Sequence, residues 1–336
     1  MPKVSIVVPS KNEEATITQL LEGITRQTYP LEDLEVVISD AMSTDQTRQK
    51  ILHFQSNHPS LEISLLENAD QTIPSGLNKA IRGSKGDIIV RLDAHSQPSE
   101  DYVERSIEVL ETTGAANVGG MWEIEPSSEH WRARSIAAAA AHPIGAGDAR
   151  YRIDGEQGEV DTVPFGTFDR SWLEKVGLFD ESLLTNEDYE LNLRLRNAGG
   201  KIWFDPSIRS QYFARADFRS LSGQYARYGY WKAAVARQNL LSLKLRQILP
   251  PLFVLAFVCL TLAAPFVLQA RWLLALQCGV YAAALLVAAL QISAKRKDAA
   301  LILGVPIAFS VMHFSWGGAF LAGFAASLFG FHQRGR

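Results

Sequence analysis

The chain has 336 residues, of which 47% are hydrophobic and 21% charged, and its formal net charge is −3. This charge is unevenly distributed, because residues 1–247 carry −8 whereas residues 248–336 carry +5 with a single acid, Asp298. The asymmetry excludes a uniformly soluble globule, a disordered chain and a basic nucleic-acid-binding protein, so no nucleic-acid partner is expected. Both cysteines, Cys259 and Cys278, lie in the apolar C-terminal part, which indicates neither a zinc site nor a disulfide framework.

The N-terminal region alternates predicted strands and helices. The β-branched run at residues 4–9 is typical of a strand buried on both faces, and residues 13–27 carry an apolar stripe typical of a helix. The alternation continues with strands at 34–39 and 87–92 and with helices at 45–54 and 75–82. Such units predict an α/β fold with an open parallel sheet, in which ligands bind beyond the carboxyl ends of the strands.

Polar clusters follow three of these strands, at residues 10–14, 40–45 and 93–95. Each could merely end a strand or cap the next helix, but three clusters at successive strand ends favour a binding site. A carboxylate and an imidazole two residues apart, as in Asp93 and His95, can face one divalent cation. Carboxylates suit Mg²⁺ or Mn²⁺, and the imidazole favours Mn²⁺. No glycine-rich phosphate loop is present, so this metal and basic side chains would have to neutralise any bound diphosphate.

The C-terminal third of the chain is expected to contact a membrane. Residues 209–246 hold eight Lys or Arg, one acid and interleaved aromatics, a composition typical of helices lying on an anionic leaflet. Uncharged stretches follow at 248–270, 272–292 and 299–331, and a helix needs about 20 apolar residues to span the hydrocarbon core. The third stretch fits either one tilted helix or a broken hairpin.

Positive charges predict how this anchor is oriented. Lys244 and Arg246 precede the first span and a basic cluster at 295–297 follows the second, which places both flanks in the cytoplasm. The N-terminal apolar run is too short for a secretory signal, so residues 1–247 are expected to stay there as well. Within the third stretch, His313 is a candidate either for holding a polyprenyl-diphosphate acceptor or for bonding to a neighbouring helix.

Eight segments together resemble family 2 glycosyltransferases with a GT-A fold, in particular the succinoglycan-biosynthesis ExoA type, over nearly the whole chain. They are residues 8–14, 39–45, 77–80, 86–93, 161–168, 186–196, 224–229 and 312–317. The resemblance implies a GT-A (nucleotide-diphospho-sugar transferase) domain with a mainly parallel central sheet at residues 1–215. Interfacial helices at 216–247 and about three transmembrane helices at 248–331 would follow it.

The resemblance also implies roles for residues at the strand ends. Pro9, Asn12 and Glu14 would line the nucleoside pocket, and Asp40 would hydrogen-bond the uracil of a UDP-sugar donor. Asp93 and His95 occupy the place of the DxD motif, which binds the diphosphate and its metal, Mn²⁺ or Mg²⁺. This sequence departs from the motif in having His95 where the family has a second acid.

Later motifs imply the catalytic and acceptor residues. Glu187 and Asp188 resemble the ED motif, in which the aspartate is the catalytic base. Inverting transfer needs such a carboxylate to take the proton of the acceptor hydroxyl, although Glu187 could equally be an acid in the first turn of a helix. Gln224, Arg227 and Tyr228 resemble the QxxRW motif, with Tyr in place of Trp. That motif would contact the acceptor and the diphosphate. Glu187, beside the catalytic base, would contact them as well.

These features predict a multi-pass inner-membrane enzyme with its catalytic domain in the cytoplasm. The resemblance implies that it transfers a hexose, expected to be glucose from UDP-glucose, with inversion, to a polyprenyl-diphosphate-linked saccharide in exopolysaccharide biosynthesis. Two alternatives stay open. One is a polyprenyl-phosphate glycosyltransferase, against which the motif at residues 224–228 weighs. The other is a catalytically silent membrane scaffold, against which the joint presence of Asp40, Asp93, His95 and Asp188 weighs.

Overall fold

The computed structural model describes residues 1–153, 155–238 and 243–328, which form two compact units. The first, termed the sheet unit, comprises Met1–Glu123 and Asp154–Tyr212. The second, termed the helical unit, comprises Ile124–Ile153 and the chain from Phe213 onward. Residues 239–242 and 329–331 of the predicted interfacial and membrane segments lie outside the described residues.

The first half of the sheet is parallel, as the alternating pattern predicts. It contains β1 (Val4–Ser10), β2 (Leu34–Asp40), β3 (Glu62–Glu67) and β4 (Ile88–Arg91), in the order β3-β2-β1-β4. The strands predicted at 4–9, 34–39 and 87–92 are confirmed. Ser10 pairs with Asp40 and Val7 with Arg91, so the polar clusters that follow these strands lie at one edge of the sheet.

Helices connect the parallel strands. They are α1 (Ile17–Thr25), α2 (Thr47–Asn57) and α3 (Ile73–Gly83). Helix α1 begins four residues later than predicted, because the carbonyl of Glu13 accepts hydrogen bonds from the N–H groups of Thr16 and Ile17 and forms a turn. The residues between β1 and α1 therefore remain in a loop at the site edge.

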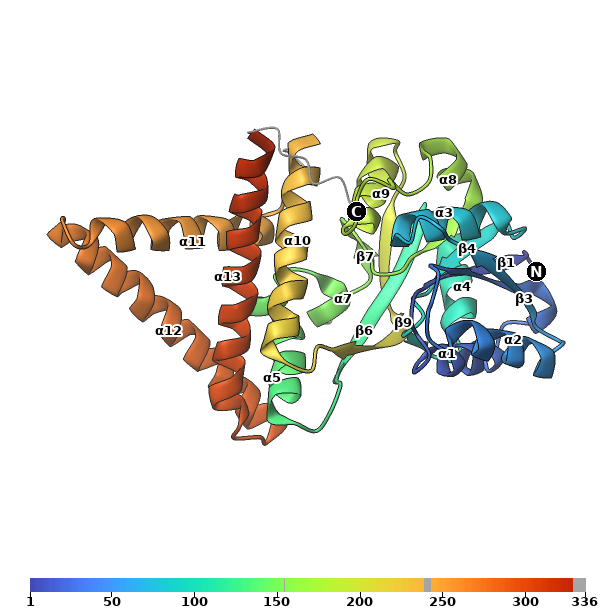
Figure 1. Ribbon diagram of the computed structural model, residues 1–336, viewed down its shortest axis with the longest axis horizontal. Helices are drawn as coiled ribbons and strands as arrows, with labels where there is room; N and C mark the ends of the chain where they lie inside the picture. The colour runs from blue at the N-terminus through green and yellow to red at the C-terminus, as the bar shows by residue number, and fades with distance from the viewer. Residues whose placement is uncertain (154, 239–242, 329–336) are drawn as a thin grey trace. The chain divides into compact units, whose positions relative to one another are not determined.

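The second half of the sheet is antiparallel, so the whole sheet is mixed. β8 (Thr167–Asp169) pairs antiparallel with β4 and with β6 (Asn117–Pro126). From β6 the order continues to β9 (Ile202–Ala214), which lies beside it (Figure 1), and then to β5 (Gln97–Pro98). Strand β7 (Gly158–Glu159) also pairs with β9. The parallel pattern ends at β4, because the next helix, α4 (Tyr102–Thr113), leads into β6, which does not pair with β4.

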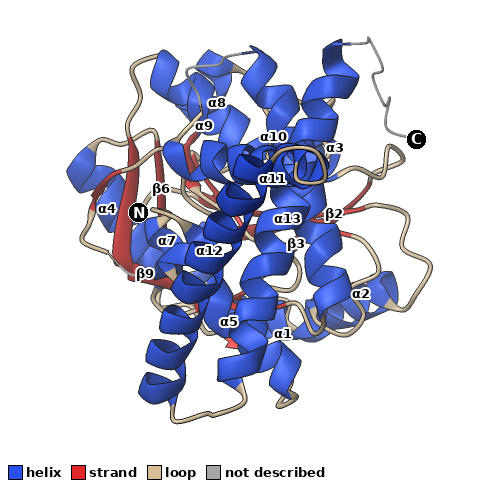
Figure 2. Cartoon of the chain, turned by 90° about the vertical axis from the view of Figure 1, so that its left-hand side faces the viewer, coloured by secondary structure: helices blue, strands red, loops and turns tan. Residues whose placement is uncertain are grey.

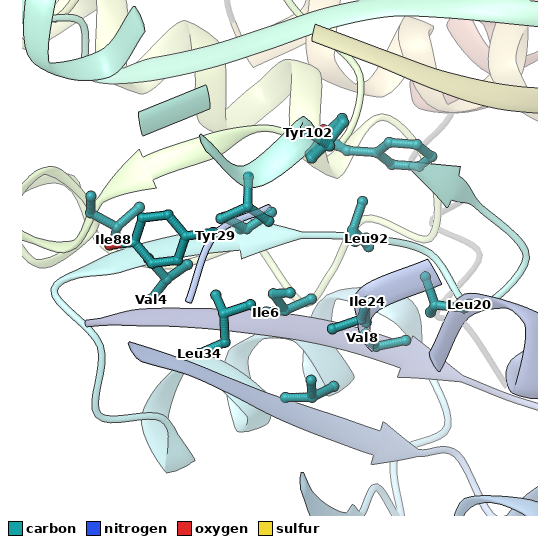
Figure 3. Packing of buried hydrophobic residues seen from close by; sticks show 14 of the residues in the cluster. Val4, Ile6, Val8, Leu20, Ile24, Tyr29, Leu34, Ile88, Leu92 and Tyr102 are labelled. Carbon is teal, nitrogen blue, oxygen red and sulfur yellow. The ribbon is translucent and has the colours of Figure 1, made fainter. Parts of the chain in front are cut away.

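A large apolar core lies against this sheet. Alternate residues of β1, Val4, Ile6 and Val8, are fully buried with Leu20 and Ile24 of α1 (Figure 3). Each such side chain stabilises the fold by about 1.5–3 kcal/mol relative to an exposed one. This packing holds the strand ends rigidly in place at the site edge. The sheet unit also contains the short 3₁₀ helix η1 (Leu31–Asp33), α8 (Arg170–Val176) and α9 (Glu187–Asn197).

The helical unit combines an internal segment with the C-terminal helices. Its members are α5 (Trp131–Ala140), α6 (Pro143–Ala146), α7 (Arg150–Ile153), α10 (Phe218–Gln238), α11 (Leu245–Ala263), α12 (Leu268–Arg296) and α13 (Leu301–Leu328). Helices α10 and α13 lie side by side along their length (Figures 1 and 2). Their backbones approach closely at Gly229, where a Cβ atom would collide with the backbone of Trp316.

Within the described residues, three helices are long and apolar enough to cross a membrane, namely Leu245–Ala263, Leu268–Arg296 and Leu301–Ala326. The third is continuous throughout its described length, which favours the single helix over the broken hairpin. Arg271 stabilises the tight connection between α11 and α12, because it donates hydrogen bonds to the carbonyls of Ala264 (2.7 Å) and Pro265 (3.2 Å). Large apolar side chains are exposed here, such as Phe266 in the connection and Trp272 on α12.

His313 joins three elements of the helical unit. One ring nitrogen, Nε2, lies 2.8 Å from the carbonyl oxygen of Ile144, and the other, Nδ1, lies 2.9 Å from the hydroxyl of Tyr281. A carbonyl only accepts, so Nε2 donates and Nδ1 accepts from the tyrosine. Both nitrogens therefore have protein partners, which favours the helix-bonding interpretation of His313 over acceptor binding.

Candidate functional site

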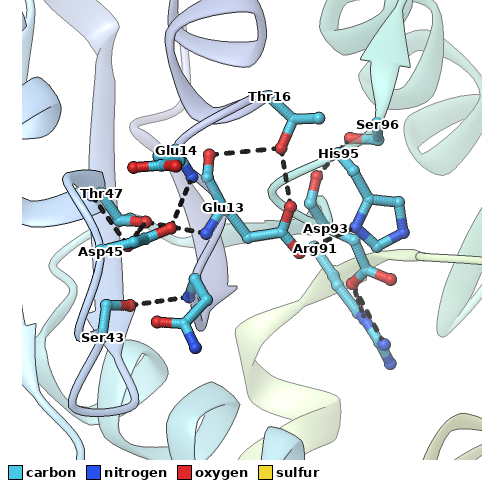
Figure 4. A network of polar contacts seen from close by, with 11 residues as sticks. Glu13, Glu14, Thr16, Ser43, Asp45, Thr47, Arg91, Asp93, His95 and Ser96 are labelled. Carbon is cyan, nitrogen blue, oxygen red and sulfur yellow. Dashed lines mark hydrogen bonds and ion pairs between the residues drawn. The ribbon is translucent and has the colours of Figure 1, made fainter.

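Hydrogen bonds join the loop after β1 to the loop after β2 in the sheet unit. The two loops together form one side of the candidate site, termed the loop wall. The N–H of Asn12 donates to the Ser43 hydroxyl (2.8 Å), and its side-chain oxygen accepts from the N–H of Thr44 (2.9 Å). The N–H of Glu14 donates to Asp45 (3.1 Å, Figure 4). Asn12 adopts a left-handed backbone conformation with φ of 54°, which Asn tolerates better than most residues. The loops after β1 and β2 thus form one structure.

Asp40 ends β2 behind this wall and is completely buried. Its Oδ2 atom accepts from the N–H of Ser43 (3.1 Å) and from Arg48 (3.0 Å). Its Oδ1 atom is buried with no hydrogen-bond partner among the described residues. A buried acceptor without a donor is costly, so a ligand N–H group is the partner that this atom suits. Pro9, at the end of β1, lies partly buried beside the same edge.

Glu14 and Asp45 have structural partners in the loop wall. The Glu14 carboxylate accepts from the N–H of Gln46 (3.0 Å), and Asp45 accepts from the N–H (3.0 Å) and hydroxyl (2.5 Å) of Thr47. Desolvation raises the pKa of Asp45, but the hydrogen bonds from Thr47 and from the Glu14 N–H outweigh it and hold that pKa below its usual value. The charged form of Asp45 is therefore part of the loop structure.

A buried arginine joins two predicted motifs of the site. Arg91, the last residue of β4, contacts Asp93 Oδ1 through Nε (3.3 Å) and Nη2 (3.2 Å). Its Nη2 atom also lies 3.1 Å from Glu187 Oε1 at the start of α9. The side chains of Arg91 and Glu187 are only 6% and 7% exposed. The strand that carries Asp93 and the helix that carries Asp188 are therefore tied by one guanidinium group.

The electrostatics of this cluster follow from its burial. Burial lowers the pKa of Arg91, but the carboxylates of Asp93, Glu187 and Asp188 outweigh this and raise it, so the guanidinium stays charged. Burial raises the pKa of Glu187; Arg91 opposes this, and Asp188 and Asp93 add to it. Asp93 and Glu187 thus contact one guanidinium group at the edge of the sheet, and the charge of Asp188 acts on the same group.

Asp188 follows Glu187 in the first turn of α9 and is half-buried. Its Oδ1 atom accepts from the N–H of Tyr189 at 2.8 Å. The helix begins after Asn186, whose φ of 67° turns the chain sharply into it. Asp188 and Glu187 therefore project from a helix N-terminus, where the helix dipole stabilises their negative charge.

His95 is half-exposed in the turn after β4. Its Nδ1 atom lies 3.2 Å from Glu13 Oε1, and the Asp93 carbonyl accepts from the N–H (2.9 Å) and hydroxyl (2.7 Å) of Ser96 (Figure 4). Residues 93–96 thus form the turn that the simpler interpretation expects, and this turn presents Asp93 and His95 at the site edge.

The donor set at this turn fits a divalent cation. Asp93 and His95 supply an oxygen and a nitrogen two residues apart, and Mg²⁺ or Mn²⁺ is commonly bound by one or two side chains together with substrate phosphates. Across residues 1–153, 155–238 and 243–328, no cluster of three or more His, Cys, Asp or Glu side chains is arranged to hold a metal. The remaining ligands would therefore come from a diphosphate and water.

The predicted acceptor motif lies in the helical unit. Gln224 is buried in α10, and its amide donates to the Tyr228 hydroxyl at 2.9 Å. Arg227 is exposed on the same helix. The sheet unit therefore contains the residues predicted for donor and catalysis, whereas the helical unit contains Gln224, Arg227 and Tyr228.

Two residues of the site were missed by the sequence analysis. Arg91 could have been noticed as a charged residue within an otherwise apolar strand, where an unpaired charge is not tolerated. Glu13 carries no such signal, because it is one acid among several polar residues in the loop after β1. Its contact with His95 depends on the pairing of β1 with β4, across 82 positions of sequence.

Solved glycosyltransferases share this architecture. A mannosyltransferase from Pyrobaculum calidifontis, in complex with GDP-Man and Mn²⁺, superposes with a TM-score of 0.62 at 21% identity, covering 98% of this chain and 88% of its own. Staphylococcus aureus TarS (residues 1–349), in complex with UDP-GlcNAc, superposes with a TM-score of 0.52 at 15% identity, covering 99% and 93%. The predicted GT-A fold class is therefore confirmed, with a mixed sheet.

Sequence comparison identifies the family. The model for glycosyl transferase family 2 matches residues 5–177, and the chain belongs to this family. It is 30% identical to the succinoglycan biosynthesis protein ExoA of Rhizobium meliloti over 98% of this chain and 96% of that protein. It is 31% identical, over 70% of this chain and 74% of the relative, to a dolichyl N-acetyl-α-D-glucosaminyl phosphate 3-β-D-2,3-diacetamido-2,3-dideoxy-β-D-glucuronosyltransferase of Methanococcus voltae. The three apolar C-terminal helices suggest membrane association.

Proposed function

We propose that this protein is a membrane-anchored inverting glycosyltransferase that transfers glucose from UDP-glucose to a polyprenyl-diphosphate-linked saccharide during exopolysaccharide synthesis. The observation that carries the proposal is the contact of Arg91 with both Asp93 and Glu187, the residue next to Asp188, at the sheet edge of a family 2 glycosyltransferase. This contact supports a diphosphate-binding turn at Asp93 and a catalytic base at Asp188 as parts of one site.

Each residue has a defined task in the proposed reaction. Asp40 accepts a hydrogen bond from the nucleobase through its buried Oδ1 atom, while Pro9, Asn12 and Glu14 form the loop wall of the nucleoside pocket. Asp188 takes the proton of the acceptor hydroxyl as that oxygen attacks the anomeric carbon from the face opposite the diphosphate. Asp93 and His95 would hold Mn²⁺ or Mg²⁺. When bound there, the cation would stabilise the negative charge of the leaving diphosphate.

The acceptor side of the proposal depends on the helical unit. Gln224, Arg227 and Tyr228 contact the acceptor and the diphosphate in this scheme, with Glu187 beside the base. A lipid-linked acceptor is supported by the three apolar helices and by the dolichyl phosphate acceptor in the name of the M. voltae relative. The exopolysaccharide pathway is supported by the similarity to ExoA, a succinoglycan biosynthesis protein. Glucose is the hexose that the resemblance to the ExoA type implies.

The proposed location is the inner membrane, crossed several times, with the sheet unit in the cytoplasm. Exposed Lys295, Arg296 and Lys297 at the turn between α12 and α13 support a cytoplasmic position for that turn. UDP-sugars are charged and water-soluble, so a cytoplasmic donor site and a membrane-borne acceptor would meet at the leaflet surface. The predicted domain boundaries at residues 215 and 247 are retained as part of this proposal.

A panel of radiolabelled sugar nucleotides tests this function. Membranes containing the protein are incubated with each donor, the lipids are extracted, and the linkage of the labelled product is determined. Label from UDP-glucose in a lipid-linked saccharide, with inverted anomeric configuration, is expected. Label on a polyprenyl monophosphate would indicate the alternative enzyme, and no transfer from any donor would indicate a silent scaffold; either contradicts the proposal.

A further inference from the structure

Glu13 is held firmly in the loop between β1 and α1. One carboxylate oxygen, Oε2, accepts from the Thr16 hydroxyl at 2.7 Å, and the other, Oε1, lies 3.2 Å from His95 Nδ1 (Figure 4). Its backbone is also fixed, because its N–H donates to the Thr47 hydroxyl (2.8 Å) and its carbonyl accepts from the N–H of Ile17 (2.9 Å). Hydrogen bonds to its side chain and to its backbone thus orient the Glu13 carboxylate toward the His95 imidazole.

This contact selects one form of His95. An ionised carboxylate only accepts hydrogen bonds, so Nδ1 must carry the hydrogen. In the neutral imidazole the lone pair then resides on Nε2, the atom at the opposite side of the ring. Histidines that bind metals in proteins almost always donate their other N–H to a carboxylate, a carbonyl or water, which fixes ring orientation and raises basicity.

The contact also changes the charge at the turn. Asp93 lies 3.2 Å from the Arg91 guanidinium, which offsets part of its charge, and a neutral His95 adds no charge. The Glu13 carboxylate therefore adds negative charge next to the imidazole. Glu13 has only 25% of its side chain exposed, so this charge is incompletely screened by solvent. Orientation and charge therefore act in the same direction, toward tighter cation binding.

We propose that Glu13 is a positioning residue that orients His95 so that Nε2 binds the divalent cation held by Asp93. This inference rests on the proposed metal site of the glycosyltransferase and adds a residue to it. Glu13 acts through His95 and contacts neither the cation nor the sugar. Thr16 assists by fixing the carboxylate, so a chain of three side chains, Thr16, Glu13 and His95, leads from the start of α1 to the cation.

The test uses the full-length protein in detergent and four variants. Glu13→Ala removes the carboxylate, Glu13→Asp keeps its charge but shortens its reach by one methylene group, and Thr16→Val removes only the hydroxyl that orients it. Glu22→Ala, which deletes an exposed acid from helix α1, is the matched control. Mn²⁺ binding is measured by electron paramagnetic resonance, with Mn²⁺ alone and with saturating UDP. The tautomer of His95 is measured by ¹⁵N NMR on the metal-free protein.

We expect Glu13→Ala and Glu13→Asp to weaken Mn²⁺ binding by about 10–100-fold, the range found when such supporting groups are removed. Thr16→Val should weaken it less, and Glu22→Ala should leave it unchanged. The ¹⁵N signals of His95 should move from the Nδ1–H form toward the Nε2–H form in both Glu13 variants. The NMR measurement needs neither metal nor sugar, so it reports on Glu13 even if the protein transfers no glucose.

Several results would overturn the inference. Wild-type Mn²⁺ affinity in Glu13→Asp, together with weak binding in Glu13→Ala, would mean that only charge matters. An unchanged His95 tautomer in Glu13→Ala would exclude the positioning role, and so would a wild-type protein that binds no Mn²⁺ with or without UDP. If the Glu13 variants fail to fold, Thr16→Val decides, because unchanged Mn²⁺ affinity there contradicts the proposed chain.

Discussion

The ion pair between Arg91 and Glu187 offers a strict test of how the site is held together. Replacing Arg91 with Met keeps much of the side-chain volume but leaves Glu187, only 7% exposed, without its cation. Removing one partner of a buried pair typically costs about 3–5 kcal/mol, because the remaining charge stays in a poorly solvated place. The loss also frees Asp93, whose Oδ1 atom is held by the same guanidinium.

The expected effect is large enough to measure by thermal unfolding. For a unit of about 150–250 residues, each kcal/mol shifts the unfolding midpoint by about 2–4 °C, so Arg91→Met should lower it by about 6–20 °C. Tryptophan fluorescence reports this transition, since Trp122 and Trp203 lie partly buried beside the core of the sheet unit. The double variant Arg91→Met/Glu187→Gln removes both charges together and should recover most of the loss, because neutral buried residues need no counter-ion.

Two outcomes would refute this reasoning. An Arg91→Met protein as stable as wild type would mean that the guanidinium does not compensate a buried carboxylate. A double variant no more stable than Arg91→Met would mean that the arginine stabilises the fold through something other than Glu187, such as its position over the Phe179 ring, 5.8 Å away.

Three further predictions address pH, metal and the membrane helices. The lowered pKa of Asp45 means that its charge stabilises the fold fully above the unfolded-state pKa, about 3.9, and less as pH falls through the folded value. The difference in unfolding midpoint between wild type and Asp45→Asn should therefore be constant from about pH 7 to 5 and shrink as the pH falls below about 3.9. A difference that does not shrink with acid contradicts this. EDTA should abolish sugar transfer and added Mn²⁺ should restore it; activity that resists chelation refutes a metal at Asp93 and His95. His313→Phe should lower the free energy of unfolding by about 1–3 kcal/mol, because Ile144 and Tyr281 each lose a hydrogen-bond partner. The KM for the acceptor should stay unchanged. A raised KM at unchanged stability would instead indicate that His313 binds the acceptor.

Local sequence patterns predict much of the parallel half of the sheet. The runs at 4–9, 34–39 and 87–92 are apolar and β-branched because both faces of these strands are buried, and that composition is visible without a structure. Strand β3 is half-exposed and its sequence, Glu62–Glu67, lacks such a signal. The antiparallel strands are short or depend on distant pairing partners, as for β8 with β4, so local patterns do not reveal them.

The candidate site divides in the same way. Asp40 and Asp93 stand at strand ends, and the parallel register explains why such positions meet at one edge. The contacts of Arg91 with Glu187 and of Glu13 with His95 join residues 96 and 82 positions apart, and only tertiary structure brings them together. Likewise, the packing of α5 with the C-terminal helices depends on the close fit of Gly304 against Ser135, which composition does not indicate.

In the proposed reaction, Asp188 takes the proton of the acceptor hydroxyl as the sugar is transferred. The most direct test compares wild type with Asp188→Asn in steady-state transfer of labelled glucose from UDP-glucose to membrane lipids, with UDP affinity measured in parallel. Loss of the base should lower kcat by about 10²–10⁴-fold while UDP affinity stays within about twofold of wild type, because Asp188 does not take part in nucleotide binding. An Asp188→Asn protein that transfers glucose at the wild-type rate would contradict the account.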